Sequence, residues 1–297
     1  MIMNGIIIKA LSGFYYVSDG DRTYECKARG NFRNSGVSPL VGDSVIFETV
    51  DETEGIINTV LPRKNGLFRP PVANIDRLYI VSALENPAPN EFLIDKTAAF
   101  AEYRGIEPVI VFNKCDMGDF SRFEEIYKNA GFEVYTVSAL TGEGTEQLRL
   151  SLAGKVSAFC GNSGVGKSSI LNLLFGEDKI ETGEVSSKLG RGKHTTRHTE
   201  LYALPSGGFV ADTPGFSDLE TYGGDYEFKE NLIGCFRDLK KYAGLCKFSD
   251  CTHICEKGCA VIEALDNGLL EPTRYESYAA LFNELKDLKP WNGKKRK

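Results

Sequence analysis

The first 62 residues alternate apolar and polar positions in short runs that turn residues separate. Five runs have the length of strands, at residues 6–10, 13–18, 23–28, 43–48 and 55–60. Short strands at such spacing predict a small antiparallel barrel, most economically an OB-fold, which often carries oligonucleotides on one face. A purely structural barrel of the SH3-like kind remains an open alternative.

From about residue 75 to 215 the pattern changes to apolar strands that alternate with amphipathic helices. The expected strands are 78–84, 108–113, 133–139, 156–161 and 207–212, and the expected helices are 92–105, 120–131, 145–154 and 167–176. This alternation predicts βαβ units and an open, mostly parallel sheet. The polar segment 177–199 interrupts the pattern, and a long loop inside a compact domain is usually functional. After about residue 222 the chain is helical, then cysteine-rich, then helical again.

Composition narrows the class of protein. The chain has 297 residues, with 35 Lys and Arg against 41 Asp and Glu, and a net charge of −6. Binding of nucleic acid by bulk charge alone is therefore excluded, although the last nine residues hold five basic side chains and no acidic one. No apolar run has the length of a membrane helix, and no signal peptide is visible at the start, so we expect a cytoplasmic protein without a membrane partner.

Residues 161–168 match the phosphate-loop pattern G-x-x-x-x-G-K-S, after an expected strand and before an expected helix. The backbone N–H groups of such a loop surround a phosphate. Lys167 would contact the β- and γ-phosphates, and Ser168 would bind Mg²⁺. The residues assigned here to nucleotide binding are Gly161, Asn162, Ser163, Gly164, Val165, Gly166, Lys167, Ser168 and Ser169.

A D-x-x-G pattern, Asp212 to Gly215, ends the strand expected at 207–212. An aspartate at a strand tip can hold Mg²⁺, and the glycine N–H can contact the γ-phosphate. Thr195 and Thr196 in the polar segment would close over Mg²⁺ and the γ-phosphate as a switch. Ser168, Thr196 and Asp212 are thus the expected magnesium ligands.

Two further strand tips indicate that the base is guanine. The sequence Asn113-Lys114-Cys115-Asp116 follows one strand, and Ser138-Ala139 follows the next. A carboxylate at Asp116 can accept hydrogen bonds from N1 and the 2-amino group of guanine, a pair that adenine lacks. The backbone at Ser138 and Ala139 can donate to guanine O6. These residues argue against an ATP-dependent kinase.

Together these motifs are those of P-loop GTPases, but N-K-x-D and S-A precede the phosphate loop, so the order is circularly permuted. The chain closely resembles the RsgA (YjeQ) family of small ribosomal subunit biogenesis GTPases. The resemblance implies an N-terminal OB-fold barrel at 1–65, a central α/β circularly permuted GTPase domain at 66–222 and a mostly helical zinc-binding domain with a basic tail at 223–297. It also implies 16S rRNA of the maturing small (30S) subunit as the target. The sequence does not indicate an oligomeric state, and a monomer is the simplest expectation.

Cysteines and a histidine cluster between residues 246 and 259. The set Cys246, Cys251, His253 and Cys259 offers three thiolates and one imidazole, which suits a closed tetrahedral, structural Zn²⁺ site. The spacing is that of the resembled family. Cys255 is a fifth candidate that we do not assign as a ligand. The other four cysteines stand alone and are expected to be buried apolar residues.

In Ras-like proteins a glutamine directly after D-x-x-G orients the attacking water. This chain has Phe216 at that position, so another group must orient the water. His194, beside Thr195, is the nearest candidate, and the resemblance also indicates a histidine in this segment. We therefore assign His194, Lys167 and Thr196 to catalysis. The alternatives are a GTP-gated RNA-binding module with negligible turnover and a GTPase for another RNA target.

Overall fold

The structure is a computed structural model of the 297-residue chain. It describes residues 1–30, 32, 38–68, 71–85, 87–176, 199–212 and 226–289. The chain divides into two compact units. The first comprises Met1–Leu78, Thr145–Cys160 and Lys167–Asp218, and the second comprises Tyr79–Gly144, Gly161–Gly166 and Leu219–Lys297.

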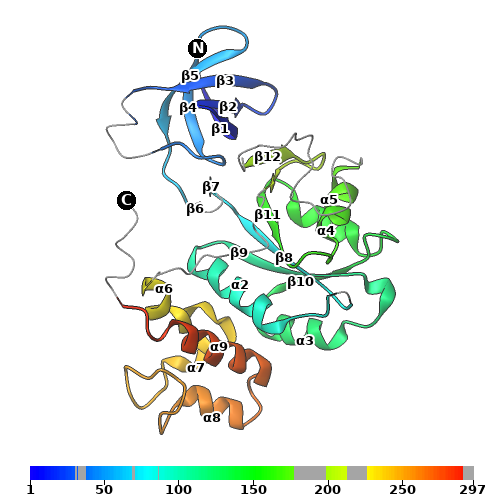
Figure 1. Cartoon of the computed structure of the whole chain (residues 1–297), viewed down its shortest axis with the longest axis vertical. Helices are drawn as coiled ribbons and strands as arrows, with labels where there is room; N and C mark the ends of the chain where they lie inside the picture. Colours follow the sequence, from blue (N-terminus) through cyan, green and yellow to red (C-terminus); the bar gives the residue numbers. More distant parts are fainter. Residues whose placement is uncertain are drawn as a thin grey trace. The chain divides into compact units, whose positions relative to one another are not determined.

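The first unit begins with the expected five-stranded barrel (Figure 1). Its strands are β1 (Ile2–Leu11), β2 (Phe14–Ser18), β3 (Thr23–Ala28), β4 (Ser44–Thr49) and β5 (Glu54–Val60). Strand β1 pairs with both β2 and β4, and β3 pairs in parallel with β5, which closes the barrel. Alternate residues such as Val17, Cys26 and Phe47 are fully buried and form its core. Tyr24 also belongs to that core.

The remainder of the first unit is an α/β element. Strand β11 (Val156–Cys160) pairs in parallel with β13 (Phe209–Asp212), which pairs antiparallel with β12 (Glu200–Ala203). Helices α4 (Thr145–Leu152) and α5 (Lys167–Phe175) accompany these strands (Figure 1). Strand β12 also pairs with barrel strand β1, so the barrel and this sheet are continuous.

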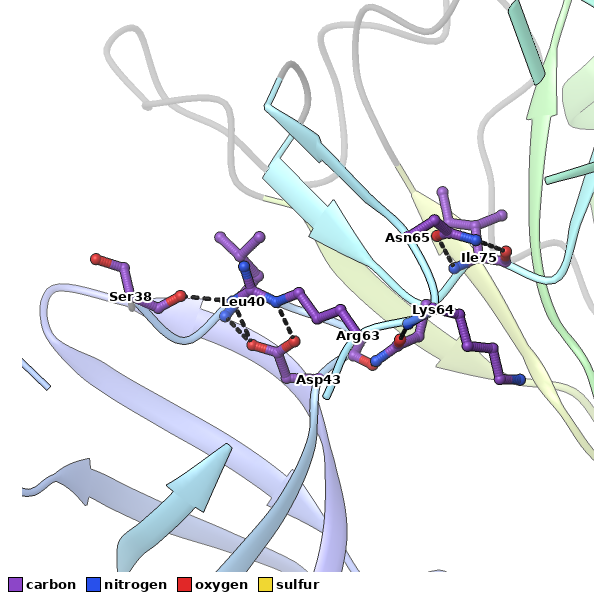
Figure 2. A network of polar contacts seen from close by, with 9 residues as sticks. Ser38, Leu40, Asp43, Arg63, Lys64, Asn65 and Ile75 are labelled. Atoms are coloured by element: carbon purple, nitrogen blue, oxygen red, sulfur yellow. Dashed lines mark hydrogen bonds and ion pairs between the residues drawn. The ribbon is translucent and has the colours of Figure 1, made fainter. Parts of the chain in front are cut away.

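A polar network joins the barrel to the segment that follows it (Figure 2). The fully buried carboxylate of Asp43 accepts hydrogen bonds from Arg63 Nε at 2.7 Å, Arg63 Nη2 at 2.8 Å and Leu40 N at 2.7 Å. The segment continues as the hairpin of β6 (Gly66–Phe68) and β7 (Pro71–Ala73). Asn65 then exchanges two hydrogen bonds with the backbone of Ile75.

The second unit contains β8 (Arg77–Ala83), α2 (Glu91–Tyr103), β9 (Glu107–Asn113), the 3-10 turn η1 (Cys115–Met117), α3 (Ser121–Asn129) and β10 (Glu133–Val137). Strands β9 and β10 are parallel, with Val137 opposite Asn113. Both strands therefore end at the same edge of the sheet. Asn90 caps α2, where its side chain accepts a hydrogen bond from Leu93 N at 3.0 Å.

The C-terminal part of this unit is helical, as expected. Its elements are α6 (Tyr226–Glu230), η2 (Leu232–Cys235), α7 (Arg237–Ala243), α8 (Ala260–Asp266) and α9 (Pro272–Leu285). Helix α9 lies along α2 (Figure 1). Phe228, Phe236 and Leu281 are fully buried in one apolar core that also includes Ala99 of α2. The helical part and α2 are thus packed as one body.

The fold class predicted from the sequence is confirmed. Strands β6, β7 and β12, each three or four residues long, were not predicted. Among the described residues, no helix combines the length and the apolar character needed to cross a bilayer.

Candidate functional site

The side chain of Asn113 connects three predicted motifs within the second unit. It ends β9 and is only 2% exposed. Its side-chain Nδ2 donates to Val165 O of the phosphate loop at 2.8 Å, and its Oδ1 accepts from Ala139 N at 3.1 Å. One amide therefore fixes the phosphate loop and the Ser138-Ala139 loop relative to the Asn113–Asp116 segment.

Asp116 presents an exposed carboxylate in the turn after Asn113. Ser138, fully buried at the end of β10, donates its hydroxyl to Asp116 Oδ1 at 2.5 Å and so orients the carboxylate. Lys114 has a left-handed backbone with φ of 67° and donates to Glu85 O at 3.2 Å. Burial raises the pKa of the neighbouring Cys115 thiol, with further contributions from Glu143 and Asp116, so this thiol stays protonated. The arrangement suits a ligand with two adjacent N–H donors.

Two glycines of the phosphate loop are required by close backbone approach. Gly166 has φ of +91°, and a Cβ there would lie 2.2 Å from Asn113 Nδ2. Gly161 has φ of +133°, and a Cβ there would lie 2.1 Å from Val81 O. Any side chain at either position would clash and would be strained. The loop can therefore approach Val81 and Asn113 this closely only because these residues are glycines.

Lys167 and Ser168 lie in the first turn of α5, directly after the loop. Burial lowers the pKa of Lys167, because the charged ammonium loses solvation. A bound polyphosphate would reverse that effect. Ser168 is 7% exposed, and Ser169 follows it on the helix. Backbone N–H groups at a helix N-terminus favour an anion, so this end of α5 suits phosphate.

Asp212 is the last residue of β13, in register with Glu200 of β12. The parallel pairing of β13 with β11 places Asp212 at the strand edge where the phosphate loop begins. His194, Thr195, Thr196 and Gly215 lie outside the described residues, as does Phe216.

The structure brings together the four predicted zinc ligands. One ligand atom from each of Cys246, Cys251, His253 and Cys259 lies within 4.8 Å of the others. His253 Nδ1 is 3.4 Å from Cys246 Sγ and 3.5 Å from Cys259 Sγ. Burial lowers the pKa of His253, which keeps the imidazole neutral and able to bind a metal. Three sulfurs and one nitrogen at these distances fit tetrahedral zinc, and the exposed Cys255 is not part of the group.

A carboxylate that the sequence did not single out organises the loop of these ligands. Glu256 accepts hydrogen bonds from Thr252 N at 2.7 Å, Thr252 Oγ1 at 2.5 Å, Ile254 N at 3.0 Å and Cys255 N at 3.1 Å. The donors lie on both sides of His253 in the chain, and the His253 backbone is left-handed with φ of 62°. From α9, Tyr275 donates to His253 O at 3.0 Å and Tyr278 donates to Thr252 O at 2.8 Å.

The fold and the order of these motifs define a circularly permuted P-loop GTPase, in which N-K-x-D and S-A precede the phosphate loop. The RsgA GTPase family model matches residues 60–222, and the RsgA N-terminal domain model matches residues 4–57. The chain belongs to the RsgA GTPase family, and it is a GTP hydrolase.

Similar proteins agree over nearly the whole length. A small ribosomal subunit biogenesis GTPase RsgA of Caldanaerobacter subterraneus subsp. tengcongensis is 45% identical over 288 residues, 96% of each chain. One from Geobacillus thermodenitrificans is 44% identical over 96% of this chain and 98% of its own. Among solved structures, YjeQ from Thermotoga maritima matches with a TM-score of 0.82 and 35% identity, over 97% of this chain and 100% of its own. YloQ, a circularly permuted GTPase, matches with a TM-score of 0.82 and 34% identity, over 98% and 97%.

Proposed function

We propose that this GTPase acts in the late maturation of the small ribosomal subunit, binds it through 16S rRNA and hydrolyses GTP faster when bound. The geometry around Asn113 carries the nucleotide part of the proposal, because one buried amide links the three loops assigned to the base and the phosphates. The partner follows from similar proteins, whose names specify small ribosomal subunit biogenesis.

Within this proposal, Asp116 selects guanine and Ser138 holds its carboxylate in place. Residues 113–116 and 138–139 contact the base, whereas residues 161–169 contact the phosphates. Lys167 neutralises charge that develops on the phosphates in the transition state. Ser168, Thr196 and Asp212 would hold Mg²⁺, which when bound neutralises the same charge.

Hydrolysis requires a water molecule that attacks the γ-phosphorus while the bond to the β–γ bridging oxygen breaks. The products are GDP and phosphate. We assign the orientation of this water to His194, on sequence grounds alone. Thr195, Thr196 and Gly215 would contact the γ-phosphate region in the GTP-bound state.

The proposed RNA contacts involve the barrel. Its Lys27 ammonium lies 5.1 Å from the centre of the Phe14 ring, and Tyr15 and Tyr16 are only partly buried on the same strand. Aromatic rings beside cations suit stacking against bases. We further propose domain boundaries at 1–65, 66–222 and 223–297, a structural zinc ion at Cys246, Cys251, His253 and Cys259, and a monomeric, cytoplasmic protein.

The test compares steady-state hydrolysis of GTP and ATP with and without purified small ribosomal subunits. We expect small subunits to increase GTP turnover at least ten-fold, and we expect ATP turnover to be negligible. Lys167→Ala should hydrolyse neither nucleotide. GTP turnover that subunits leave unchanged would remove the ribosomal partner and favour another RNA. Binding of GTP with no turnover in any condition would favour the nucleotide-gated RNA-binding module.

A further inference from the structure

Barrel strand β1 and strand β12 of the α/β element are joined by an ion pair. Barrel strand β1 pairs with β12, with Lys9 opposite Glu200 in the register. The Lys9 ammonium is 3.0 Å from Glu200 Oε2 and 3.1 Å from Oε1. Both side chains are about two-thirds buried, at 35% and 27% exposed. The two residues are 191 positions apart in the chain, so this contact exists only in the folded protein.

Glu200 is also opposite Asp212 in the antiparallel pairing of β12 with β13. Lys9, Glu200 and Asp212 therefore occupy one row across three neighbouring strands. The next strand, β11, pairs with β13 and leads into the phosphate loop. A shift of β12 along this row would be passed to the strand end that carries the proposed magnesium ligand, because laterally hydrogen-bonded strands move together.

A second contact anchors Glu200 to the phosphate-binding helix. The Tyr202 hydroxyl lies 3.5 Å from Glu200 Oε2, and the Tyr202 ring packs edge-on against Phe175, the last residue of α5, with centroids 6.2 Å apart. Helix α5 begins with Lys167 and Ser168. Glu200 thus lies between the barrel, the end of β13 and the helix of the phosphate loop.

We propose that Lys9 is a positioning residue for GTP hydrolysis: it holds Glu200, and with it β12, in the register that places Asp212 for magnesium binding. The orientation of the barrel then sets the geometry of the magnesium end of the site. A partner that binds the barrel can change the hydrolysis rate through this row without touching the nucleotide. The inference rests on the proposed role of Asp212.

The experiment uses three full-length variants. Lys9→Glu makes the barrel repel Glu200, whereas Lys9→Arg keeps the ion pair. The matched control is Lys64→Glu, which reverses another lysine of the same unit, 71% exposed, in a pair with Asp76 at 2.8 Å. Asp76 is hydrogen-bonded to Val156 of β11 and not to β12. For each variant, kcat and KM for GTP, the Mg²⁺ concentration for half-maximal rate, the melting temperature and subunit affinity are measured, first without and then with subunits.

In the basal reaction we expect Lys9→Glu to lower kcat about two- to five-fold and to raise the half-saturating Mg²⁺ concentration by a similar factor, which is the range of a partly exposed ion pair. KM for GTP and the melting temperature should stay near wild type. Lys9→Arg and Lys64→Glu should match the wild type. The basal reaction contains no RNA, so a loss there is not a lost RNA contact.

Wild-type kcat and Mg²⁺ dependence in Lys9→Glu would overturn the inference, and so would an equal loss in Lys64→Glu or in Lys9→Arg. The proposed partner is tested separately by the wild type. If subunits do not stimulate wild-type turnover, the ribosomal assignment fails, while the basal comparison still decides the role of Lys9.

Discussion

Ion pairs join the barrel and the C-terminal helices to neighbouring elements, but the ion pairs at these two junctions differ in how far they are exposed to solvent. At the barrel, Asp43 is fully buried while its partner Arg63 remains 28% exposed, and the Lys9–Glu200 pair is also partly exposed. At the C-terminal helices, Arg274 of α9 is 1% exposed and pairs with Asp95 of α2 at 2.5 Å and with Asp238 of α7 at 2.9 Å. An apolar core surrounds the second junction.

This difference indicates what each junction can do. The charges of Lys9 and Glu200 remain partly solvated and exchange partners at low cost, so this contact of the barrel can change without unfolding. The buried guanidinium of Arg274 must stay paired with both carboxylates, because an unpaired buried charge is very unfavourable. Burial acts to lower the pKa of Arg274, but Asp95 and Asp238 hold it above its ordinary value. The C-terminal helices and α2 should therefore move as one body.

The largest effect should come from the proposed zinc ligands. Cys251→Ser would remove one of the four proposed ligands, and structural zinc sites contribute roughly 10 kcal/mol of binding free energy in small domains. We expect loss of bound zinc and of amide hydrogen-exchange protection in residues 245–259. Cys255→Ser is the matched control, since Cys255 is exposed and outside the cluster. Equal zinc content in both variants would contradict the ligand assignment.

The next largest effect should follow from Arg274→Met, which keeps much of the side-chain volume but leaves Asp95 and Asp238 without their cation. It also removes the guanidinium from the faces of Phe236 and Phe132, 5.0 and 5.3 Å away. We expect a loss of about 3–5 kcal/mol in the free energy of unfolding, measured with urea.

The control for Arg274 is Lys96→Met, which breaks the partly exposed pair Lys96–Glu284 between α2 and α9, at 22% and 46% exposed. This variant should lose less than about 1 kcal/mol. Similar losses in the two variants would show that burial of the ion pair does not distinguish this junction.

At the barrel junction, Asp43→Asn should have a smaller effect. The amide retains one acceptor for Leu40 N or Arg63 but loses the charge, and hydrogen bonds to charged groups contribute about 1.5–3 kcal/mol. Because Arg63 can turn towards solvent, we expect a loss near the lower end, measured by urea unfolding of the barrel. Lys64→Met, at the 71% exposed Lys64, should change stability by less than about 1 kcal/mol. A loss equal to that of Arg274→Met would remove the contrast between the junctions.

The sequence predicted the parts of the molecule that depend on local pattern. Strand tips carry Asn113, Asp116 and Ser138 because apolar strands end where polar loops begin, and the loops converge as parallel strands must. The junctions could not be predicted in this way. Arg274 and Asp95 are 179 residues apart, and nothing near either residue indicates its partner. Glu256 was missed because a carboxylate that binds backbone N–H groups has no sequence signature.

The smallest effect should come from Glu256→Gln in the zinc loop. Although burial acts to raise it, the hydrogen bonds from Thr252 and Cys255 lower the pKa of Glu256 to about 2. A carboxylate whose pKa is depressed in the folded state stabilises it above the unfolded pKa of about 4.3, and that stability is lost as pH falls towards 2. We expect Glu256→Gln to lose about 1 kcal/mol in the free energy of unfolding. The difference in free energy of unfolding between the variant and the wild type should be constant between pH 7 and about 4.5. Glu263→Gln, an exposed carboxylate on α8, should show no loss. A difference that stays the same from pH 7 down to pH 2 would mean that Glu256 titrates as an ordinary surface carboxylate and does not hold the loop around His253.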